Sequence, residues 1–499
     1  ARDFASNVMT HAELASKAKL KDLGNGEVVE IPFVPLPHND DFELDFHRPY
    51  IDEIELEGKD GTKLERVPDV FDCWFESGSM PYAQDHYPFD NLDKFEPKPG
   101  WFQKSRGYPA DFIAEGLDQT RGWFYSMLVL GVALFGRTPY KNVIVNGIVL
   151  AEDGAKMSKR LKNYPDPVEL LERHGADAIR YYLLASPLMR ADDLNFSEKS
   201  VAEVASKLIG RLTNVVSFYE LYKEASTIYG TAGTSVSTNS LDRWILSRLS
   251  ETIHAVEEGM EAYELDKATR PLMDFVEDLS TWYLRRSRER FKNGGDDGAH
   301  ALKTTREVLK TFSKVAAPFI PFVAEAVYQK VKDKDDEESV HLASWPEHGV
   351  FDLKLVADMN EVRDVVSLGL EKRQKAGIKV RQPLSKALTK SKTAVDFAEL
   401  VRDELNVKEV VFKPTQTELI ELDTELTDEL REEGELRDLI REIQDLRKLA
   451  GLNPNDEAML IVDSSRKEAV NRHWGALKKA TNLKSQEAGQ AFSVTHLPH

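Results

Sequence analysis

The sequence contains a single cysteine, Cys73, among 499 residues. One cysteine excludes an internal disulfide and a cysteine-rich zinc module, and it is typical of a reducing compartment. Free cysteines usually behave as small hydrophobes, so we expect Cys73 to be a buried thiol and not a nucleophile. Because the histidines are scattered as well, no protein-bound zinc is predicted.

Long apolar runs are also lacking. No stretch of 18 or more apolar residues occurs, so the sequence predicts no membrane span. Residues 1–21 contain no apolar segment of the signal-peptide type. The chain does not begin with methionine, which we interpret as an arbitrary cut or a processed end. We therefore expect a cytoplasmic protein without a membrane partner.

Positive charge is in deficit, since 66 lysines and arginines face 85 acidic residues and give a net charge of −19. This balance disfavours nonspecific coating of nucleic acid, because phosphate contacts dominate such affinity. A local basic face can still bind an RNA of defined shape. The hydrophobic share of 41% and the charged share of 30% indicate a globular protein, and the length allows two to four domains.

The hydrophobic pattern divides the chain into three parts. Between about 66 and 175, apolar runs at 111–114 and 142–150 predict strands that alternate with helices, as in a parallel sheet. From 176 to about 345, helical spacing predicts a bundle. Residues 346–499 predict a mixed α/β region, and no internal repeat is apparent. The helices expected in the second part are 201–219, 241–262, 265–291, 299–314 and 318–331.

The segment Lys156-Met-Ser-Lys-Arg160 lies in a predicted loop between a β-branched strand and a helix. Two lysines three residues apart in such a loop can close over a polyphosphate and offset the charge that develops as pyrophosphate leaves. The alternative is an exposed basic loop. Gly154 before the segment and Asn163-Tyr-Pro-Asp-Pro167 after it favour phosphate binding.

A second segment, Glu115-Gly-Leu-Asp-Gln-Thr-Arg-Gly-Trp-Phe-Tyr125, follows a predicted strand and opens a helix. Its two carboxylates and its amide can accept hydrogen bonds from ribose hydroxyls and from an α-ammonium group. Open α/β sheets bind ligands at this end of their strands. Alternatively, Asp118 caps the helix and the aromatic residues are core.

Two further segments are basic. The predicted helix Asp278-Leu-Ser-Thr-Trp-Tyr-Leu-Arg-Arg-Ser-Arg288 places guanidinium groups beside aromatic rings, which suits phosphate and base contacts. A solvated face packed through its aromatic residues is an equally good interpretation. Lys372-Arg-Gln-Lys-Ala-Gly-Ile-Lys-Val-Arg381 is the other basic patch.

Residues 151–160, followed by Asn163-Tyr-Pro-Asp-Pro167, resemble the second signature of class I aminoacyl-tRNA synthetases. The form that ends in arginine is similar to the isoleucyl family, in its eukaryotic/archaeal-like form. The resemblance extends over nearly the whole chain and is strongest from about 66 to 200. It implies a fold of the α/β plus all-α class: the C-terminal half of a Rossmann-type catalytic domain, a helical-bundle anticodon-binding domain and a small mixed α+β C-terminal region.

The resemblance also implies domain boundaries. The expected segments are the exit of an editing insertion (1–65), the second half of the Rossmann domain (66–175), a helical stem-contact junction (176–240), the anticodon-binding bundle (241–345) and a tRNA-contacting region (346–499).

The family assigns roles to residues of these segments. Lys159 would be the leading catalytic lysine and Lys156 its assistant. The ATP-binding residues would be Lys156, Met157, Ser158 and Lys159. Contacts to the aminoacyl-adenylate would come from Glu115, Gly116, Asp118, Gln119, Trp123 and, in the segment 69–80, Trp74. Contacts to tRNA would come from Trp282, Arg285, Arg286, Arg288, Lys372 and Arg373.

The first class I signature, His-x-Gly-His, does not occur in the sequence, and only His496 and His499 have its spacing. We therefore expect a C-terminal fragment of an isoleucine–tRNA ligase, a monomer that alone neither activates isoleucine nor edits. The partners would be L-isoleucine, ATP with Mg²⁺, and tRNA(Ile). Gly122-Trp-Phe-Tyr125 disfavours the valyl and leucyl relatives. A noncatalytic tRNA-binding module derived from a synthetase remains an alternative, whereas an unrelated nucleotidyltransferase does not explain the helical bundle.

Overall fold

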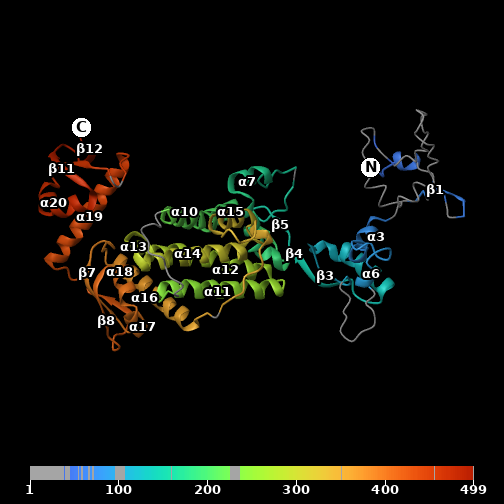
Figure 1. The fold of residues 1–499 in the computed structure, drawn as a ribbon, viewed down its shortest axis with the longest axis horizontal. Coiled ribbons are helices and arrows are strands. Elements are labelled where there is room, and N and C mark those ends of the chain that lie inside the picture. The colour runs from blue at the N-terminus through green and yellow to red at the C-terminus, as the bar shows by residue number, and fades with distance from the viewer. Residues whose placement is uncertain are drawn as a thin grey trace. The chain divides into compact units, whose positions relative to one another are not determined.

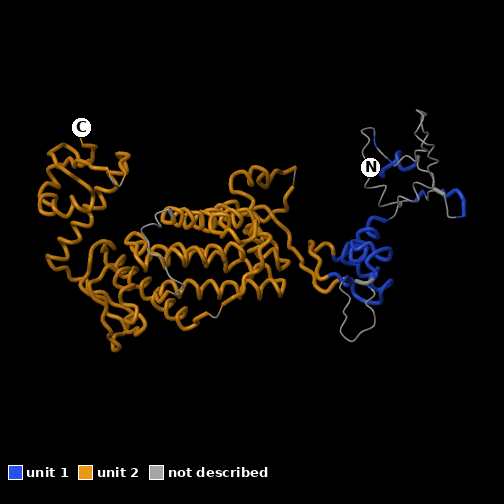
Figure 2. The backbone as a smooth tube through the Cα atoms, in the orientation of Figure 1, with its two compact units in different colours: residues 1–110, 120–139 blue, residues 111–119, 140–499 orange. Residues whose placement is uncertain are grey.

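The computed structural model describes residues 37, 39, 45–53, 56–57, 60–65, 68–69, 72–95, 107–158, 160–224, 237–349, 351–453 and 456–497. Most of the segment 1–65, expected to be the exit of an insertion, lies outside these residues, and so does Lys159. The chain forms two compact units (Figure 2): unit 1 combines residues 1–110 with 120–139, and unit 2 combines residues 111–119 with 140–499.

Unit 1 is mainly helical, and its centre is the packing of α3 (Cys73–Gly78) on α6 (Trp123–Phe135). A Cβ atom on Gly78 would lie 2.9 Å from the Leu130 side chain, so glycine permits this close approach. Cys73 is exposed at the first position of α3, and the prediction of a buried thiol is therefore wrong. Only the far end of this short helix, at Gly78, is buried. The other elements of this unit are η2 (Tyr50–Glu53), β1 (Leu56–Glu57), β2 (Lys63–Leu64), α4 (Met80–Ala83) and α5 (Leu92–Phe95).

Unit 2 begins with short strands. The strand predicted at 111–114 is confirmed as β3 (Ala110–Gly116), which pairs with β4 (Tyr140–Asn146). The strand predicted at 142–150 is split into β4 and β5 (Val149–Leu150), and β5 pairs in parallel with β6 (Leu194–Asn195). The break falls at Gly147, where a Cβ atom would lie 1.9 Å from the Asp192 carbonyl oxygen. The helices of this part are α7 (Pro167–His174), α8 (Ala176–Leu184) and the 3-10 turn η4 (Pro187–Arg190).

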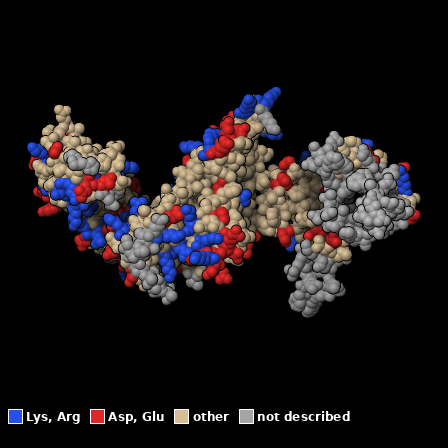
Figure 3. All heavy atoms as spheres, turned by 45° about the horizontal axis from the view of Figure 1, so that its top comes forward, with Lys and Arg blue, Asp and Glu red and all other residues tan. Residues whose placement is uncertain are grey.

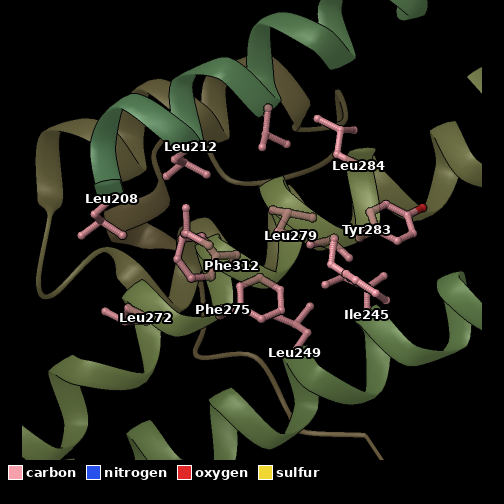
Figure 4. Packing of buried hydrophobic residues seen from close by; sticks show 14 of the residues in the cluster. Leu208, Leu212, Ile245, Leu249, Leu272, Phe275, Leu279, Tyr283, Leu284 and Phe312 are labelled. Atoms are coloured by element: carbon pink, nitrogen blue, oxygen red, sulfur yellow. The ribbon is translucent and has the colours of Figure 1, made fainter. Parts of the chain in front are cut away.

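The expected helical bundle is present in the middle of unit 2 (Figure 1). Two of its long helices contain a π-helical turn, η5 (Ala205–Gly210) and η7 (Asp278–Leu284). Leu208, Leu249, Phe275 and Phe312 meet in its core, as Figure 4 shows. The remaining elements are α9 (Glu198–Val204), α10 (Arg211–Glu224), α11 (Ser240–Glu261), α12 (Leu265–Glu277), α13 (Arg285–Asn293), α14 (Gly295–Ala316), α15 (Pro321–Val331) and η8 (Val340–Leu342).

A buried polar network joins three helices of the bundle. Asp242, on α11, is fully buried and accepts a hydrogen bond from the Tyr283 hydroxyl at 2.8 Å. The guanidinium of Arg290 donates to both Asp242 oxygens, at 2.8 and 2.7 Å. Arg290 also binds Asp297, at the start of α14. The carboxylate of Asp242 is thus paired with a charge, as a buried carboxylate must be.

The C-terminal part of unit 2 consists of two copies of one small α/β arrangement (Figure 1). In each copy a long helix precedes a strand, a helical segment leads to a second, parallel strand, and a third strand pairs antiparallel with the first. We call residues 353–422 the first repeat and residues 428–496 the second repeat. The first contains α16 (Leu353–Lys375), β7 (Leu384–Thr389), α17 (Lys392–Asp396), α18 (Ala398–Leu405), β8 (Val407–Phe412) and β9 (Ile420–Leu422). The second contains α19 (Asp428–Leu449), β10 (Ala458–Val462), α20 (Lys467–Thr481), β11 (Leu483–Ala488) and β12 (Ser493–His496).

The expectation that the chain has no internal repeat is therefore wrong. The missed signal is short: Arg-x-x-Ala-Gly occurs at 373–377 and again at 447–451, at the end of α16 and of α19. In both copies the glycine has a positive φ, 67° at Gly377 and 72° at Gly451, which ends the helix in the left-handed conformation that glycine favours. The rest of the two sequences diverges, so only the fold makes the duplication evident.

The two repeats differ in their cores. One continuous hydrophobic cluster extends from Leu170 through the bundle to Ile420 in the first repeat. The second repeat has a separate cluster, which includes Ile443, Leu460 and Leu477. Among the described helices, none is long and apolar enough to cross a membrane.

Candidate functional site

The loop between β5 and α7 carries the lysine segment and projects away from the bundle (Figure 1). It begins with a tight turn, in which the Gly154 N–H donates to the Ala151 carbonyl at 2.9 Å. Gly154 has a φ of 81°, a conformation that side chains disfavour and that explains the glycine. The chain then returns to pair Lys156 with Leu150 in an antiparallel bridge. The lysine segment therefore starts from a fixed hairpin.

Asn163 bonds to the backbone of the lysine segment at two points, one on each side of Met157. Its Oδ1 atom accepts a hydrogen bond from the Ser158 N–H at 2.9 Å, and its Nδ2 atom donates to the Lys156 carbonyl at 3.1 Å. The Lys162 N–H donates to the Ser158 carbonyl at 3.0 Å. Asp166 then caps α7 by accepting from the Val168 N–H at 2.8 Å. The side chain of Asn163 thus closes the segment into a compact turn.

The lysine segment faces solvent on one side and the bundle on the other. Lys156 is exposed and free to approach a ligand, whereas Met157 is half-buried and packs against the helical cluster. The expected contact of Met157 with a nucleotide stays a prediction. Ser158 is half-buried, and Lys159 lies outside the described residues.

The second predicted segment lies at the end of β3. Glu115 and Asp118 are exposed, and the Asp118 carboxylate accepts a hydrogen bond from Gln119 Nε2 at 3.1 Å. A Cβ atom on Gly116 would lie 2.7 Å from the Asp118 carboxylate. Helix α6 starts after Gly122 and has no side-chain cap, so the alternative role of Asp118 as a helix cap is excluded. The two carboxylates and the amide thus lie together on the short stretch that follows β3.

The two tryptophans expected in a side-chain pocket belong to unit 1. Trp123 is half-buried, and its Nε1 atom donates to the Ser77 carbonyl at 2.8 Å, which fixes the ring of α6 against the end of α3. Trp74 is 45% exposed, so much of its ring is open to a ligand. Glu115, Gly116, Asp118 and Gln119 belong to unit 2, as does the lysine segment.

The basic helix is only partly available to RNA. Trp282 is buried, and its Nε1 atom lies 3.2 Å from the Met359 sulfur, so its ring offers no face for stacking on a base. Arg285 and Arg286 both pair with the buried carboxylate of Glu404 in the first repeat. Arg288 is exposed and forms no ion pair with any described residue. Of the four residues expected to contact tRNA here, Arg288 has the freest side chain.

The second basic patch, residues 372–381, also has one buried and one surface residue among those expected to contact tRNA. Arg373 is fully buried and donates to the backbone carbonyls of Leu405, at 2.9 Å, and of Lys379, at 2.7 Å. A guanidinium in this position is not available to a phosphate, contrary to the expectation. Lys372 is paired with the exposed Glu418 at the surface. Arg373 thus serves the fold of the first repeat.

Sequence reasoning missed the loop-closing role of Asn163. The only signal in the sequence was the residue type, because asparagine side chains in loops often hydrogen-bond to nearby backbone groups. No cluster of three or more potential metal ligands occurs among the described residues.

Comparison with known proteins matches two stretches of the chain. Residues 35–197 match the family model described as "tRNA synthetases class I (I, L, M and V)", and residues 242–388 match the "Anticodon-binding domain of tRNA ligase". The isoleucine–tRNA ligase of Protochlamydia amoebophila is 46% identical over 76% of this chain and 36% of the relative. That of Chlamydia muridarum is 47% identical over 74% of this chain and 36% of the relative. Among solved structures, the LeuRS chain of a LeuRS–tRNA–LeuAMS ternary complex from Agrobacterium radiobacter K84 is 20% identical. The two align with a TM-score of 0.42 over 60% of this chain and 36% of that chain.

The chain spans about a third of the length of the curated relatives it matches. Both relatives are bacterial, so they do not support the eukaryotic/archaeal-like form expected from the sequence. The leucyl complex is too distant to support a conclusion. The chain is homologous to isoleucine–tRNA ligases over most of its length, and it contains a class I tRNA synthetase segment followed by an anticodon-binding domain of tRNA ligase.

Proposed function

We propose that this chain acts in the isoleucine–tRNA ligase reaction, in which ATP activates isoleucine and the aminoacyl group passes to tRNA(Ile). The observation that carries the proposal is the closed lysine loop, which lies inside the stretch that matches class I synthetases. In this reaction the isoleucine carboxylate attacks the α-phosphate of ATP and pyrophosphate leaves. The acyl group then moves to the terminal adenosine of the tRNA.

The lysine loop is the part that would serve ATP. Lys156 and Lys159 would offset the negative charge that builds up on the departing pyrophosphate, with Lys159 as the leading group. Asn163 holds the Ser158 backbone and the Lys156 carbonyl, which fixes the backbone directly after Lys156. ATP enters as its Mg²⁺ complex, so the metal belongs to the substrate.

The stretch after β3 would bind the aminoacyl-adenylate. The exposed carboxylates of Glu115 and Asp118 suit the ammonium group and the ribose hydroxyls. Gly116, which leaves room for the Asp118 carboxylate, would contribute its backbone. Gln119 would add an amide. We further propose that Trp123 and Trp74 form part of the wall around the isoleucine side chain.

The exposed apolar side chains of the strand pair β3 and β4 are an argument for a larger sheet of the Rossmann type. Phe112, Leu117 and Val143 on this pair and its continuation are 51%, 49% and 42% exposed. Two strands with exposed apolar side chains do not make a stable sheet by themselves. We propose that further strands of a Rossmann-type domain, with the His-x-Gly-His signature, cover this face in the active enzyme.

The helical bundle and the C-terminal part would hold the tRNA. The match to an anticodon-binding domain, which begins at residue 242, supports this role for the bundle expected at 241–345. Arg288 and Lys372 are the surface cations of the predicted set that can turn toward RNA, Lys372 by leaving Glu418. We also propose that the protein is a cytoplasmic monomer. Because the lysine segment ends in Arg160, we further propose that the chain belongs to the eukaryotic/archaeal-like form of the family.

The alternative is a noncatalytic tRNA-binding module, which the lack of His-x-Gly-His in these 499 residues permits. Formation of isoleucyl-tRNA distinguishes the two. It is measured with labelled isoleucine on the natural polypeptide that carries this sequence, with valine and leucine in parallel. Charging of tRNA(Ile) with isoleucine supports the ligase. Binding of tRNA(Ile) without any charging would leave the module as the function.

A further inference from the structure

The two C-terminal repeats share a backbone but differ in charge at one face. This face is formed by the end of the long helix and the end of the helix before the second parallel strand. Arg373 and Arg447 occupy the same place in the two copies, and each donates to backbone carbonyls of the loop that follows. Asn406 and Asn482 both have a positive φ and both donate to that loop, at 2.9 and 3.1 Å. The two faces can therefore be compared residue by residue.

In the first repeat this face is acidic and covered. Asp403 and Glu404 precede Leu405 and Asn406 there. Glu404 is buried and pairs with Arg285 and with Arg286, whose Nε atom lies 2.8 Å from it. The first repeat thus uses this face to dock onto the basic helix α13 of the bundle.

In the second repeat the equivalent positions carry Lys479 and Ala480 in place of the two acids. The face there forms a pocket of about 670 Å³. Its polar lining includes Arg447, Lys448, Lys479 and Gln444, and none of the described residues that line it is acidic. Charge at this face is therefore reversed between the two copies.

The two lysines of the pocket are not engaged elsewhere. Lys448 and Lys479 are exposed, and neither forms an ion pair with a described residue. Other basic side chains of the second repeat do find acidic partners, such as Arg466 with Glu442 at 2.7 Å and Arg472 with Glu435 at 3.0 Å. Figure 3 shows lysine and arginine atoms in several groups over this C-terminal part, with acidic atoms between them.

The helix dipole alone does not account for these lysines. Helices α19 and α20 both end at the pocket, and cations near helix C-termini are stabilising. The first repeat has the same two helix ends, however, and places Asp403 and Glu404 there to meet a cationic partner. In the first repeat the charge at this face thus matches the partner that it binds, and the cationic face of the second repeat suits an anionic partner.

We propose that the pocket between the ends of α19 and α20 binds phosphate groups of an RNA backbone. This proposal rests on the proposed function, which makes a tRNA the anionic partner of this chain. Cations around a pocket that also offers amide groups suit the several oxygens of a phosphate. An acidic protein segment is the other partner that the charge allows, and the test below separates the two.

The test measures binding of the full chain to a tRNA transcript between about 50 and 200 mM salt. The variant K448Q/K479Q removes both free charges and leaves Arg447 in its structural place. We expect it to weaken binding about three- to tenfold and to lower the slope of log affinity against log salt by about one to two, since each phosphate contact contributes roughly 0.9. The control K467Q removes an exposed lysine at the opposite end of α20 and should leave both quantities unchanged.

A second variant, K479D with A480E, gives the second repeat the acids of the first. It should weaken tRNA binding more than K448Q/K479Q does, with circular dichroism unchanged. Equal binding and equal salt slopes in all variants would overturn the proposal. It would also be overturned if the substitutions weakened binding of poly-glutamate or of inorganic phosphate and not of tRNA. Isoleucine-dependent ATP–pyrophosphate exchange by the natural polypeptide that carries this sequence needs no tRNA and should not change, so failure of exchange in that unaltered polypeptide would count against the ligase alone.

Discussion

The side chain of Asn163 bonds to the backbone on both sides of Met157, accepting from the Ser158 N–H at 2.9 Å and donating to the Lys156 carbonyl at 3.1 Å. The loop that carries the two lysines is thus closed by one amide. Its curvature depends on this side chain together with the backbone hydrogen bond from the Lys162 N–H to the Ser158 carbonyl.

Replacing Asn163 with alanine should release the loop. In the natural polypeptide that carries this sequence, we expect the rate of isoleucine-dependent ATP–pyrophosphate exchange to fall by about ten- to a hundredfold, because small misplacements of charged groups cost this much. Thermal unfolding should change little, since the loop is at the surface. The control N214A removes an exposed asparagine of α10 and should retain full exchange. An unchanged rate in N163A would show that Asn163 does not position the lysines.

Substitution of Asp242 by asparagine should destabilise the helical bundle. Arg290 would then keep only the exposed Asp297 as an ionic partner, and breaking a buried pair typically costs about 3–5 kcal/mol. Native-state hydrogen exchange of α11 and α14 would report this loss. D335N, at an exposed acid of a surface loop, is the matched control and should have no effect. Equal protection in D242N and the unaltered protein would contradict the assigned role of the network.

Arg373 should be needed for the fold of the first repeat and not for RNA binding as such. Its replacement by methionine leaves the carbonyls of Leu405 and Lys379 without their donor, and hydrogen bonds from charged groups are worth about 1.5–3 kcal/mol each. We expect faster hydrogen exchange in β7 and β8, while the bundle core stays protected. A loss of tRNA affinity with unchanged protection would instead favour the direct contact expected from the sequence.

Stability should fall at acid pH through Asp297. Hydrogen bonds from Arg290 lower the pKa of Asp297, so the charged carboxylate is favoured in the folded protein. Its contribution is present above the unfolded value, which is about 3.9, and is lost as the pH falls through the lower folded pKa. We expect D297N to lose less stability than the unaltered protein between neutral pH and about pH 3. Parallel urea titrations measure this difference, and identical pH dependence would contradict the pairing.

Much of the fold of unit 2 follows from its hydrophobic pattern. The helices expected at 241–262 and 299–314 are present because long runs with helical spacing determine both the element and its buried face. The strand at 142–150 was predicted as one element, since no local pattern reveals that Gly147 contacts the backbone at Asp192. The duplicated C-terminal arrangement was missed because its shared signal is only Arg-x-x-Ala-Gly, and tertiary hydrogen bonds define the rest.

The candidate site could be predicted from sequence only as a set of segments. Residue type and the family resemblance made Arg285, Arg286 and Arg373 candidates for RNA contact, and neither gives information on burial. Glu404, which pairs with the first two, is more than a hundred residues away in the sequence. Such partners become visible only when the fold brings them together.

The most direct test of the central claim is ATP–pyrophosphate exchange by the natural polypeptide that carries this sequence, with isoleucine, valine and leucine compared. The 499-residue chain and a K159A variant are measured alongside it. The account predicts exchange that depends on isoleucine, that is weaker with valine and that is strongly reduced in K159A. Absence of exchange with every amino acid, or undiminished exchange in K159A, would contradict it.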